Sequence, residues 1–292
     1  MANFDLFGQK IEERVLLREK FIEPPFSVLD TKNGNWQNRK RKWKELGIKS
    51  EVGRDAVIFH CGTDDYRAIS QKENYNNRAE YTSIFDPVVC ELIYKWFCPE
   101  NGSILDPFAG GSVRGIVANY LGYKYTGIDI REEQIASNKE QAMEICPENP
   151  PIYYCGDSNK TLDLIDRSFD LVFSCPPYAD LEVYSDIEGD ISNMPYADFL
   201  TAYRSIILKS CKLLKKNGFA CFVVGEVRDK KGNYIGFVPD TIKAFTDCGL
   251  LFYNEAILLQ PIASASLRAA KYMESSKKLC KVHQNVLIFK KY

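Results

Sequence analysis

The stretch Ser103-Ile-Leu-Asp-Pro-Phe-Ala-Gly-Gly-Ser112 decides how this chain folds. Its apolar start predicts a short strand, and Ser112 marks the point where we expect a helix to begin and run to about Leu121. Gly110 and Gly111 let a ligand approach the backbone closely, and the amino end of the helix presents unpaired N–H groups. A strand, a glycine turn and a helix in this order are typical of the ligand-binding edge of a parallel α/β sheet. The turn is neither G-x-G-x-x-G nor a Walker loop, which disfavours a bound phosphate.

The alternation of strands and helices continues toward the C-terminus. We predict further strands at 124–130, 152–155, 169–174, 219–224, 250–259 and 286–289, and helices at 131–145, 199–214 and 240–247. This alternation predicts a Rossmann-like α/β fold, with a mostly parallel seven-stranded sheet covered on both faces. Residues 261–284 look like a polar basic loop, so we expect the last two strands to pair antiparallel and form an antiparallel edge.

The first 80 residues differ from the rest of the chain. They are polar, are broken by Pro24-Pro25 and Asn33-Gly34, and show no strand–helix alternation. We therefore predict an N-terminal extension (1–80), irregular or helical, packed on a main domain (81–292).

Two basic runs, at 32–49 and 268–291, each hold seven Lys or Arg residues in a chain whose net charge is only −1. Trp36 and Trp43 interleave with the first run and could stack on bases or belong to the core. The runs are either solvated faces or one phosphate-binding surface, and both interpretations stay open.

Composition excludes several classes of protein. The chain has 292 residues, of which 45% are hydrophobic and 26% charged, as in ordinary globular proteins. It has no apolar run long enough for a membrane span. Its ten cysteines form no C-x-x-C pair and there are only two histidines, so we expect a reducing cytoplasm and no metal site.

Carboxylates follow the next two predicted strands. Gly127-Ile-Asp129 ends one strand, about 20 residues after the glycine turn, where an acidic residue grips ribose hydroxyls. Gly156-Asp157-Ser158 ends the strand after it. Taken together, these turns predict a nucleoside-containing cofactor without a pyrophosphate cradle.

A second loop, Phe173-Ser-Cys-Pro-Pro-Tyr178, follows the strand at 169–174. Its two prolines rigidify the backbone and leave carbonyl groups free, which together with a polar side chain could accept both hydrogens of an exocyclic amine. Tyr178 offers a ring on which a base could stack. On its own, Pro-Pro-Tyr would more simply be a rigid turn.

The two loops together resemble the S-adenosylmethionine-dependent amino-methyltransferases of DNA. Residues 105–112 look like the cofactor motif of that family, and Ser174-Cys-Pro-Pro-Tyr178 looks like its catalytic Asp/Asn/Ser-Pro-Pro-Tyr motif. Glu80-Tyr-Thr-Ser-Ile-Phe-Asp-Pro87 is similar to the segment that closes over the methionine end of the cofactor. Lys281-Val-His-Gln-Asn-Val-Leu-Ile-Phe-Lys290 is similar to the last-strand motif. The resemblance implies a class I methyltransferase fold and S-adenosylmethionine as cofactor.

The resemblance also assigns site residues. The residues that it implies for cofactor binding are Thr82, Phe85, Asp106, Pro107, Phe108, Ala109, Gly110, Gly111, Asp129, Ile130, Asp157 and Ser158. Of these, Asp106, Phe108, Ala109 and Gly110 would surround the methionine moiety. The residues that it implies for catalysis on a flipped base are Ser174, Cys175, Pro176, Pro177 and Tyr178.

Cys175 departs from the family pattern, because a thiol is a weak acceptor. Ser174 or the Pro176 carbonyl could replace it as acceptor, or an ionised Cys175 could attack a pyrimidine ring. The target stays open between adenine N6, which we favour, and cytosine N4.

The resemblance implies a site-specific methyltransferase acting on double-stranded DNA, with no membrane partner and with a homodimer as one assembly. Such enzymes would belong to restriction–modification systems, phages or mobile elements. Two alternatives remain: an RNA or nucleotide methyltransferase, and a nucleic-acid-binding module that has lost catalysis.

Overall fold

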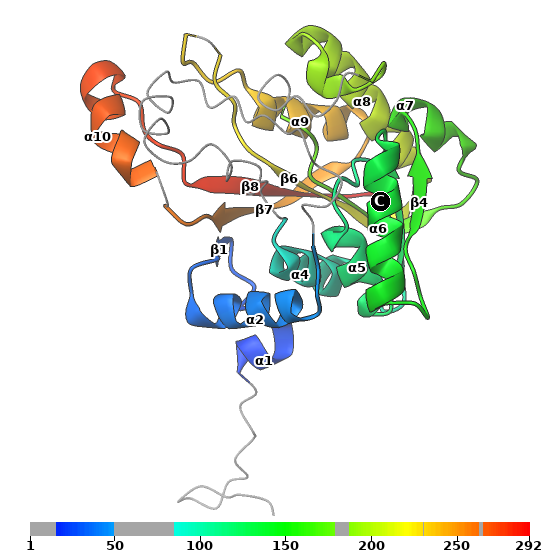
Figure 1. The fold of residues 1–292 in the computed structure, drawn as a ribbon. Coiled ribbons are helices and arrows are strands. Elements are labelled where there is room, and N and C mark those ends of the chain that lie inside the picture. Colours follow the sequence, from blue (N-terminus) through cyan, green and yellow to red (C-terminus); the bar gives the residue numbers. More distant parts are fainter. Residues whose placement is uncertain (1–15, 50–84, 179–186, 230, 263–264) are drawn as a thin grey trace, which may run out of the picture.

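The structure, a computed structural model, describes residues 16–49, 85–178, 187–229, 231–262 and 265–292 (Figure 1). One eight-stranded sheet forms the centre of these residues, in the order β1-β7-β8-β6-β5-β2-β3-β4. Its strands are β1 (Val28–Asp30), β2 (Ser103–Asp106), β3 (Lys124–Asp129), β4 (Ile152–Cys155), β5 (Phe169–Ser174), β6 (Leu214–Val224), β7 (Leu251–Leu259) and β8 (His283–Lys290).

The helices of the described residues surround this sheet. They are α1 (Leu17–Phe21), α2 (Gly34–Glu45), α4 (Pro87–Phe97), α5 (Val113–Tyr120), α6 (Glu132–Ile145), α7 (Ser158–Thr161), α8 (Tyr196–Leu213), α9 (Phe237–Asp247) and α10 (Ala265–Ser276).

Each face of the sheet carries its own apolar core. Successive strand residues point to opposite faces, so Leu105 packs with the helices α8 and α9, whereas Ile104 packs with α2, α4 and α5. On β6, Phe222 belongs to the core that contains Leu105, and Cys221 belongs to the core that contains Ile104. The two helical layers lie above and below the sheet in Figure 1. This three-layer arrangement explains why the central strands read as nearly continuous apolar runs.

The chain changes direction in the sheet between β2 and β5, which are parallel neighbours. From β2 it continues through β3 to β4 on one side, and from β5 to β6 on the other. Ligands in open α/β sheets bind outside the carboxyl ends of the strands at such a switch point. The loops that follow Asp106 and Ser174 both begin there.

The predicted strands are confirmed, and β7 and β8 pair antiparallel as expected. The antiparallel strand β8 does not form an edge, however, because it lies between β6 and β7 and pairs antiparallel with both. The long connection from residue 260 to 282 allows this crossing. The edge beyond β7 is instead occupied by β1, which pairs parallel with β7. A strand of only three residues gave no recognisable pattern in the sequence.

The expectation of a loop at 261–284 was wrong, because this segment contains α10. None of the residues of α10 is buried. A helix that packs no face against the core needs no apolar stripe at helical spacing, which is the pattern that identifies a helix in a sequence. The helix stands away from both helical layers, at the upper left of Figure 1.

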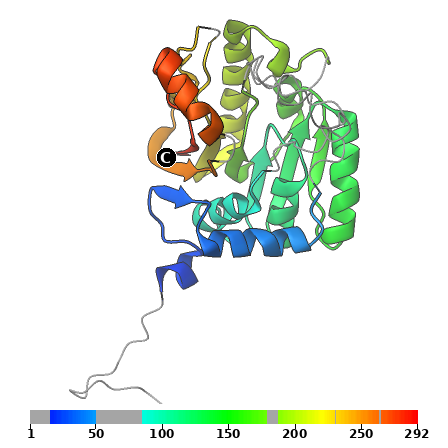
Figure 2. The same cartoon turned by 60° about the vertical axis from the view of Figure 1, so that its left-hand side comes forward.

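The described part of the N-terminal segment packs against the main fold, with α2 running along α4 (Figure 2). Trp36 and Trp43 are buried in the core, and their ring N–H groups donate to Asp86 and Glu91 at 3.2 and 2.9 Å. They therefore belong to the core and are not available for stacking on bases. The predicted boundary at residue 80 lies outside the described residues. In the described ranges, no helix is both long and apolar enough to cross a membrane.

Candidate active site

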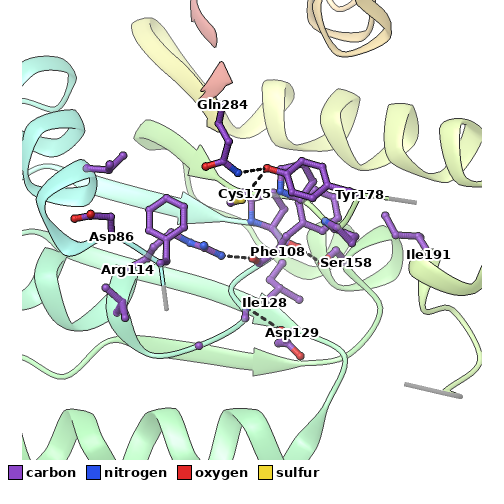
Figure 3. A pocket seen from close by; sticks show the side chains of 18 of the residues that line it. Asp86, Phe108, Arg114, Ile128, Asp129, Ser158, Cys175, Tyr178, Ile191 and Gln284 are labelled. Carbon is purple, nitrogen blue, oxygen red and sulfur yellow. Dashed lines mark hydrogen bonds between the residues drawn. The ribbon is translucent and has the colours of Figure 1, made fainter. Parts of the chain in front are cut away.

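A cavity of about 650 Å³ opens at the carboxyl ends of β2, β3 and β5. Its wall includes the loop after β2, the end of β3, the start of α7 and the loop after β5. Figure 3 shows Phe108, Asp129, Cys175 and Tyr178 gathered around it. This volume is typical of sites for small molecules and cofactors.

The loop after β2 passes close to β3. Gly110 has φ +51°, in the left-handed region that glycine occupies without strain, and its N–H donates to Asp129 Oδ2 at 2.9 Å. The N–H of Ala109 donates to the carbonyl of Ile128 at 2.9 Å. A Cβ atom on Gly127 would lie 2.8 Å from the Ala109 Cβ, so glycine is required on β3 for this approach.

Asp106 lies beneath the loop and is completely buried. Its Oδ2 accepts from Arg114 Nε at 2.6 Å and from the Tyr125 hydroxyl at 2.7 Å. Its Oδ1 accepts from the Ser174 hydroxyl at 2.5 Å and from the N–H of Phe108 at 3.1 Å. Asp106 therefore holds the loop in shape and does not line the cavity.

Arg114, on α5, is the cation that balances Asp106. Burial lowers the pKa of Arg114, but the charge of Asp106, the neighbouring Tyr125 and Cys175 and the hydrogen bond to Asp106 together outweigh it, and the net pKa is raised well above its usual value. Its guanidinium also donates to the carbonyls of Phe108 and Ala109, and it lies 4.9 Å from the ring centroid of Phe85. Arg114 thus fixes the cofactor loop from behind. Burial and Asp106 raise the pKa of Tyr125 as well, so its hydroxyl stays protonated as a donor.

Asp129, at the end of β3, lies beside the loop that follows β2. Its oxygens accept from the N–H groups of Gly110 and Arg131, each at 2.9 Å. These two bonds, with an ion pair to Arg131 at 3.8 Å, orient the Asp129 carboxylate at the wall of the cavity. This geometry fits the ribose of a nucleoside.

The far end of the cavity is partly apolar, with Phe108, Ile130 and Ile191 on its wall. Asp157 caps α7 through a 2.8 Å bond from the Asn159 N–H to its Oδ1. Ser158 donates to the Pro107 carbonyl at 2.5 Å, which ties α7 to the cofactor loop. Apolar side chains beside a carboxylate are the surroundings that a flat heterocycle with a polar edge, such as adenine, requires.

The loop after β5 closes the other end. Cys175 Sγ lies 3.8 Å from the Tyr178 hydroxyl, and that hydroxyl accepts from Gln284 Nε2 at 2.7 Å. The Tyr178 ring packs edge-on against Phe237 with the centroids 6.0 Å apart. Tyr178 is therefore held both at its ring and at its hydroxyl.

The structure brings most of the predicted site residues to this one cavity. The predicted residues on its wall are Phe85, Pro107, Phe108, Gly110, Gly111, Asp129, Ile130, Asp157, Ser158, Cys175, Pro176, Pro177 and Tyr178. Asp106, Ala109 and Ser174 are buried behind the wall. Thr82 lies outside the described residues. Ser174 is bonded to Asp106, so a shift of the loop that made it the acceptor would break this bond.

Other residues on the wall were not found from the sequence. Thr31, Gln37 and Lys40 come from the N-terminal segment, and Lys40 donates to Asp86 at 2.9 Å. Gln260 and Gln284 come from the ends of β7 and β8. Asp86, also on the wall, does carry a local signal, because it precedes Pro87 as a helix N-cap does.

Comparison with known proteins gives a family match. Residues 10–140 match the family model described as DNA methylase, N6_N4_Mtase. A search of curated proteins found no match.

Solved structures with similar folds are distant in sequence. TrmN from Thermus thermophilus is 12% identical, with a TM-score of 0.48 over 71% of this chain and 49% of that chain. Magnesium protoporphyrin IX methyltransferase from Synechocystis PCC 6803, with bound SAH, is 14% identical, with a TM-score of 0.47 over 71% and 81%. A putative rRNA-methylase from Clostridium thermocellum is 14% identical, with a TM-score of 0.46 over 72% and 100%. This chain spans about half the length of the TrmN chain.

The family match begins in the N-terminal segment and extends through the cofactor loop and Asp129 into α6. It thus covers the part of the cavity wall that comes from β2 and β3, and the Cys-Pro-Pro-Tyr loop lies outside the matched residues. Residues 10–140, a little under half of the chain, thus match the model of the N6/N4 DNA methylase family.

Proposed function

We propose that this protein transfers a methyl group from S-adenosylmethionine to the exocyclic amine of a base in double-stranded DNA, with adenine N6 favoured over cytosine N4. One observation carries the proposal: the cofactor loop and the Cys175–Tyr178 loop line the same cavity, side by side at the switch point between β2 and β5. A methyl donor and an amine bound to these two loops would meet inside the cavity. Holding two reactants in line supplies much of the rate of such a reaction.

In this proposal, residues of the cavity wall would hold the cofactor. Asp129 would accept from the ribose hydroxyls, and Phe108, Ile130 and Ile191 would enclose the adenine beside Asp157. The methionine end would lie along the backbone of Gly110 toward Phe85. When bound, S-adenosylmethionine supplies an electrophilic methyl group on a sulfonium.

The target base would enter on the side of Cys175 and Tyr178. The amine nitrogen would form a bond to the methyl carbon with its lone pair. The bond from that carbon to the sulfonium sulfur would break, with its electrons kept by sulfur, and the nitrogen would lose one proton to solvent. A base in a duplex cannot reach such a cavity, so we infer that it flips out of the stack.

The duplex itself would approach beside α10. Residues 265–281 hold Arg268, Lys271, Lys277, Lys278 and Lys281 against Glu274 alone. This segment joins β7 and β8 just beyond Gln260 and Gln284, which line the cavity. Positive charge at the mouth of the site would attract the phosphate backbone.

The proposal extends to location and setting. The described cysteines are free thiols, which supports the cytoplasm as the place of action. A role in restriction–modification, or in a phage or mobile element, stays a prediction, as does a homodimer.

Transfer of labelled methyl from S-adenosylmethionine to unmethylated DNA tests the proposal, followed by nucleoside digestion and mass analysis. We expect labelled N6-methyladenine, and we expect Tyr178→Ala to abolish it without loss of cofactor binding. Matched reactions with RNA and with free nucleotides identify the other substrate classes. Label confined to RNA or nucleotides would overturn the DNA assignment, and binding of DNA without any transfer would indicate a binding module.

A further inference from the structure

The acceptor for the target amine is the weakest part of this site. An amine that gives its lone pair to a methyl carbon carries two N–H groups, and both need acceptors for the lone pair to point at the methyl. The prolines leave a backbone carbonyl for one of them. The side-chain position beside it is Cys175, whose sulfur accepts hydrogen bonds poorly.

Gln284, at the start of β8, is linked to Cys175 through the side chain of Tyr178. Its Nε2 donates to the Tyr178 hydroxyl at 2.7 Å, and that hydroxyl lies 3.8 Å from Cys175 Sγ. Figure 3 shows Gln284 reaching from its strand toward Tyr178, with Cys175 beside the same hydroxyl. Cys175, Tyr178 and Gln284 all line the cavity.

A second glutamine fixes the orientation of this amide. Gln260 Nε2 donates to Gln284 Oε1 at 2.9 Å, across the antiparallel pair of β7 and β8. If the Gln284 amide alone turned over, its Nε2 would face Gln260 Nε2 and that bond would be lost, whereas the Tyr178 hydroxyl could donate to Oε1 instead. A carbonyl oxygen has two lone pairs, so Gln284 Oε1 keeps one acceptor position after the bond from Gln260.

We infer that Gln284 Oε1 accepts a hydrogen bond from the target base and takes over the side-chain role for which Cys175 is poorly suited. The inference rests on the proposed function and names the residue that serves the amine in that site. The acceptor draws an N–H of the base toward β8, so the nitrogen lone pair faces the methyl carbon as the new bond forms. Gln260 is a positioning residue, because it acts only through Gln284.

A different role for Gln284 would be to hold the Tyr178 hydroxyl and nothing more. The two roles differ in their dependence on Cys175. If Gln284 replaces a missing acceptor, restoring a strong acceptor at 175 makes Gln284 dispensable. If Gln284 only holds Tyr178, its loss has the same effect whichever residue is at 175.

A double-mutant cycle between Gln284→Met and Cys175→Asn tests the inference. Methionine keeps nearly the volume of glutamine and removes the acceptor. We expect Gln284→Met to lower kcat about 10- to 100-fold in the native background, as the loss of one hydrogen bond worth 1.4 to 2.8 kcal/mol would do. In the Cys175→Asn background we expect a loss below about threefold. Equal losses in the two backgrounds would overturn the inference.

Further variants separate accepting from packing. We expect Gln284→Glu to retain more activity than Gln284→Met and to gain a fall in rate at acid pH, as its carboxylate becomes protonated. Tyr178→Phe removes the hydroxyl partner, and Gln284→Met should still lower kcat in that background. The control is Asn285→Ala, because Asn285 points to the other face of β8 and donates to Glu255 at 2.7 Å.

A measurement of base flipping, which does not depend on methyl transfer, completes the test. DNA with 2-aminopurine at the mapped target, in the presence of S-adenosylhomocysteine, reports flipping by fluorescence. We expect Gln284→Met to reduce this signal about 10-fold or more at fixed enzyme, with unchanged affinity for S-adenosylhomocysteine. If the native enzyme methylates no base, the proposed function fails. If it methylates DNA and the cycle shows no coupling, only the inference fails.

Discussion

Ser174 Oγ donates a hydrogen bond of 2.5 Å to Oδ1 of Asp106, and this bond joins the last residue of β5 to the last residue of β2. Asp106 begins the loop after β2, and Ser174 precedes Cys175 of the loop after β5. Because both side chains are completely buried, the bond fixes the two loops relative to each other from beneath. Ser174 is thus a positioning residue.

We expect Ser174→Ala to lower the free energy of unfolding by roughly 1 to 3 kcal/mol, because a buried carboxylate oxygen loses a partner. Methyl transfer should fall more than binding of S-adenosylhomocysteine, since the loops lose their alignment. Urea unfolding, calorimetry and the transfer assay measure the three effects. Ser210→Ala is the control, because the hydroxyl of the buried Ser210 donates within its own helix to the carbonyl of Ile206 at 2.8 Å. A Ser174→Ala enzyme as active as this control would contradict the positioning role.

Arg114→Met should be more damaging, at about 3 to 5 kcal/mol, because it leaves the Asp106 charge buried and uncompensated. Replacing both partners, as Asp106→Asn with Arg114→Met, should cost less than the sum of the single changes. Denaturant unfolding of the four proteins measures the coupling. Strict additivity would show that the two charges do not stabilise each other.

Asp129→Ala should weaken binding of S-adenosylhomocysteine by roughly 10- to 150-fold, the loss of about 1.5 to 3 kcal/mol of charge-assisted hydrogen bonding. Isothermal calorimetry measures it, with thermal unfolding to confirm that the loop still folds. Glu133→Ala removes an exposed carboxylate from α6 nearby and should leave the affinity unchanged. Equal affinities for the two variants would remove Asp129 from the ribose site.

The basic segment at α10 predicts salt-dependent binding of DNA. Lys271→Gln with Lys277→Gln should reduce the slope of log K against log salt concentration by up to about 2, if each lysine meets one phosphate. The control is Lys124→Gln with Lys216→Gln, which changes the charge by the same amount. Lys124 lies at the amino end of β3 and Lys216 near the amino end of β6, away from the cavity. Fluorescence anisotropy over a range of salt concentrations compares the pairs. Identical slopes would exclude α10 from the DNA surface.

The lowered pKa of Asp170 predicts that the stability of the fold decreases at acid pH. Burial raises the pKa of Asp170, but hydrogen bonds from Lys215 and Ser103 outweigh it, and the net pKa lies below its usual value. A lowered pKa in the folded state stabilises the protein above the unfolded pKa of about 3.9, and this contribution disappears as pH falls through the folded value. Asp170→Asn should therefore cost roughly 1 to 2 kcal/mol at pH 7, and this cost should shrink as pH falls below about 3.9. Unfolding curves at several pH values check it, and a difference independent of pH would contradict it.

The sequence by itself determined the strands and the two loops of the site. Strand 103–106, its glycine turn and the helix after it carry local signals, namely an apolar run, glycines at a tight turn and a helix start. Asp129 and Tyr178 could be assigned to one crevice because parallel strands end at the same edge of a sheet. These inferences needed only short stretches of chain and the general rules of α/β folds.

Tertiary structure alone decided what each polar residue does. Asp106 is aligned with a cofactor motif in the sequence, but Arg114, Tyr125 and Ser174 hold it behind the wall of the cavity. Trp36 is followed by a basic run, yet it is buried. The reason is physical: burial and hydrogen-bond partners depend on residues far apart in the chain. Gln284 is 106 residues from Tyr178, and only the folded sheet brings them together.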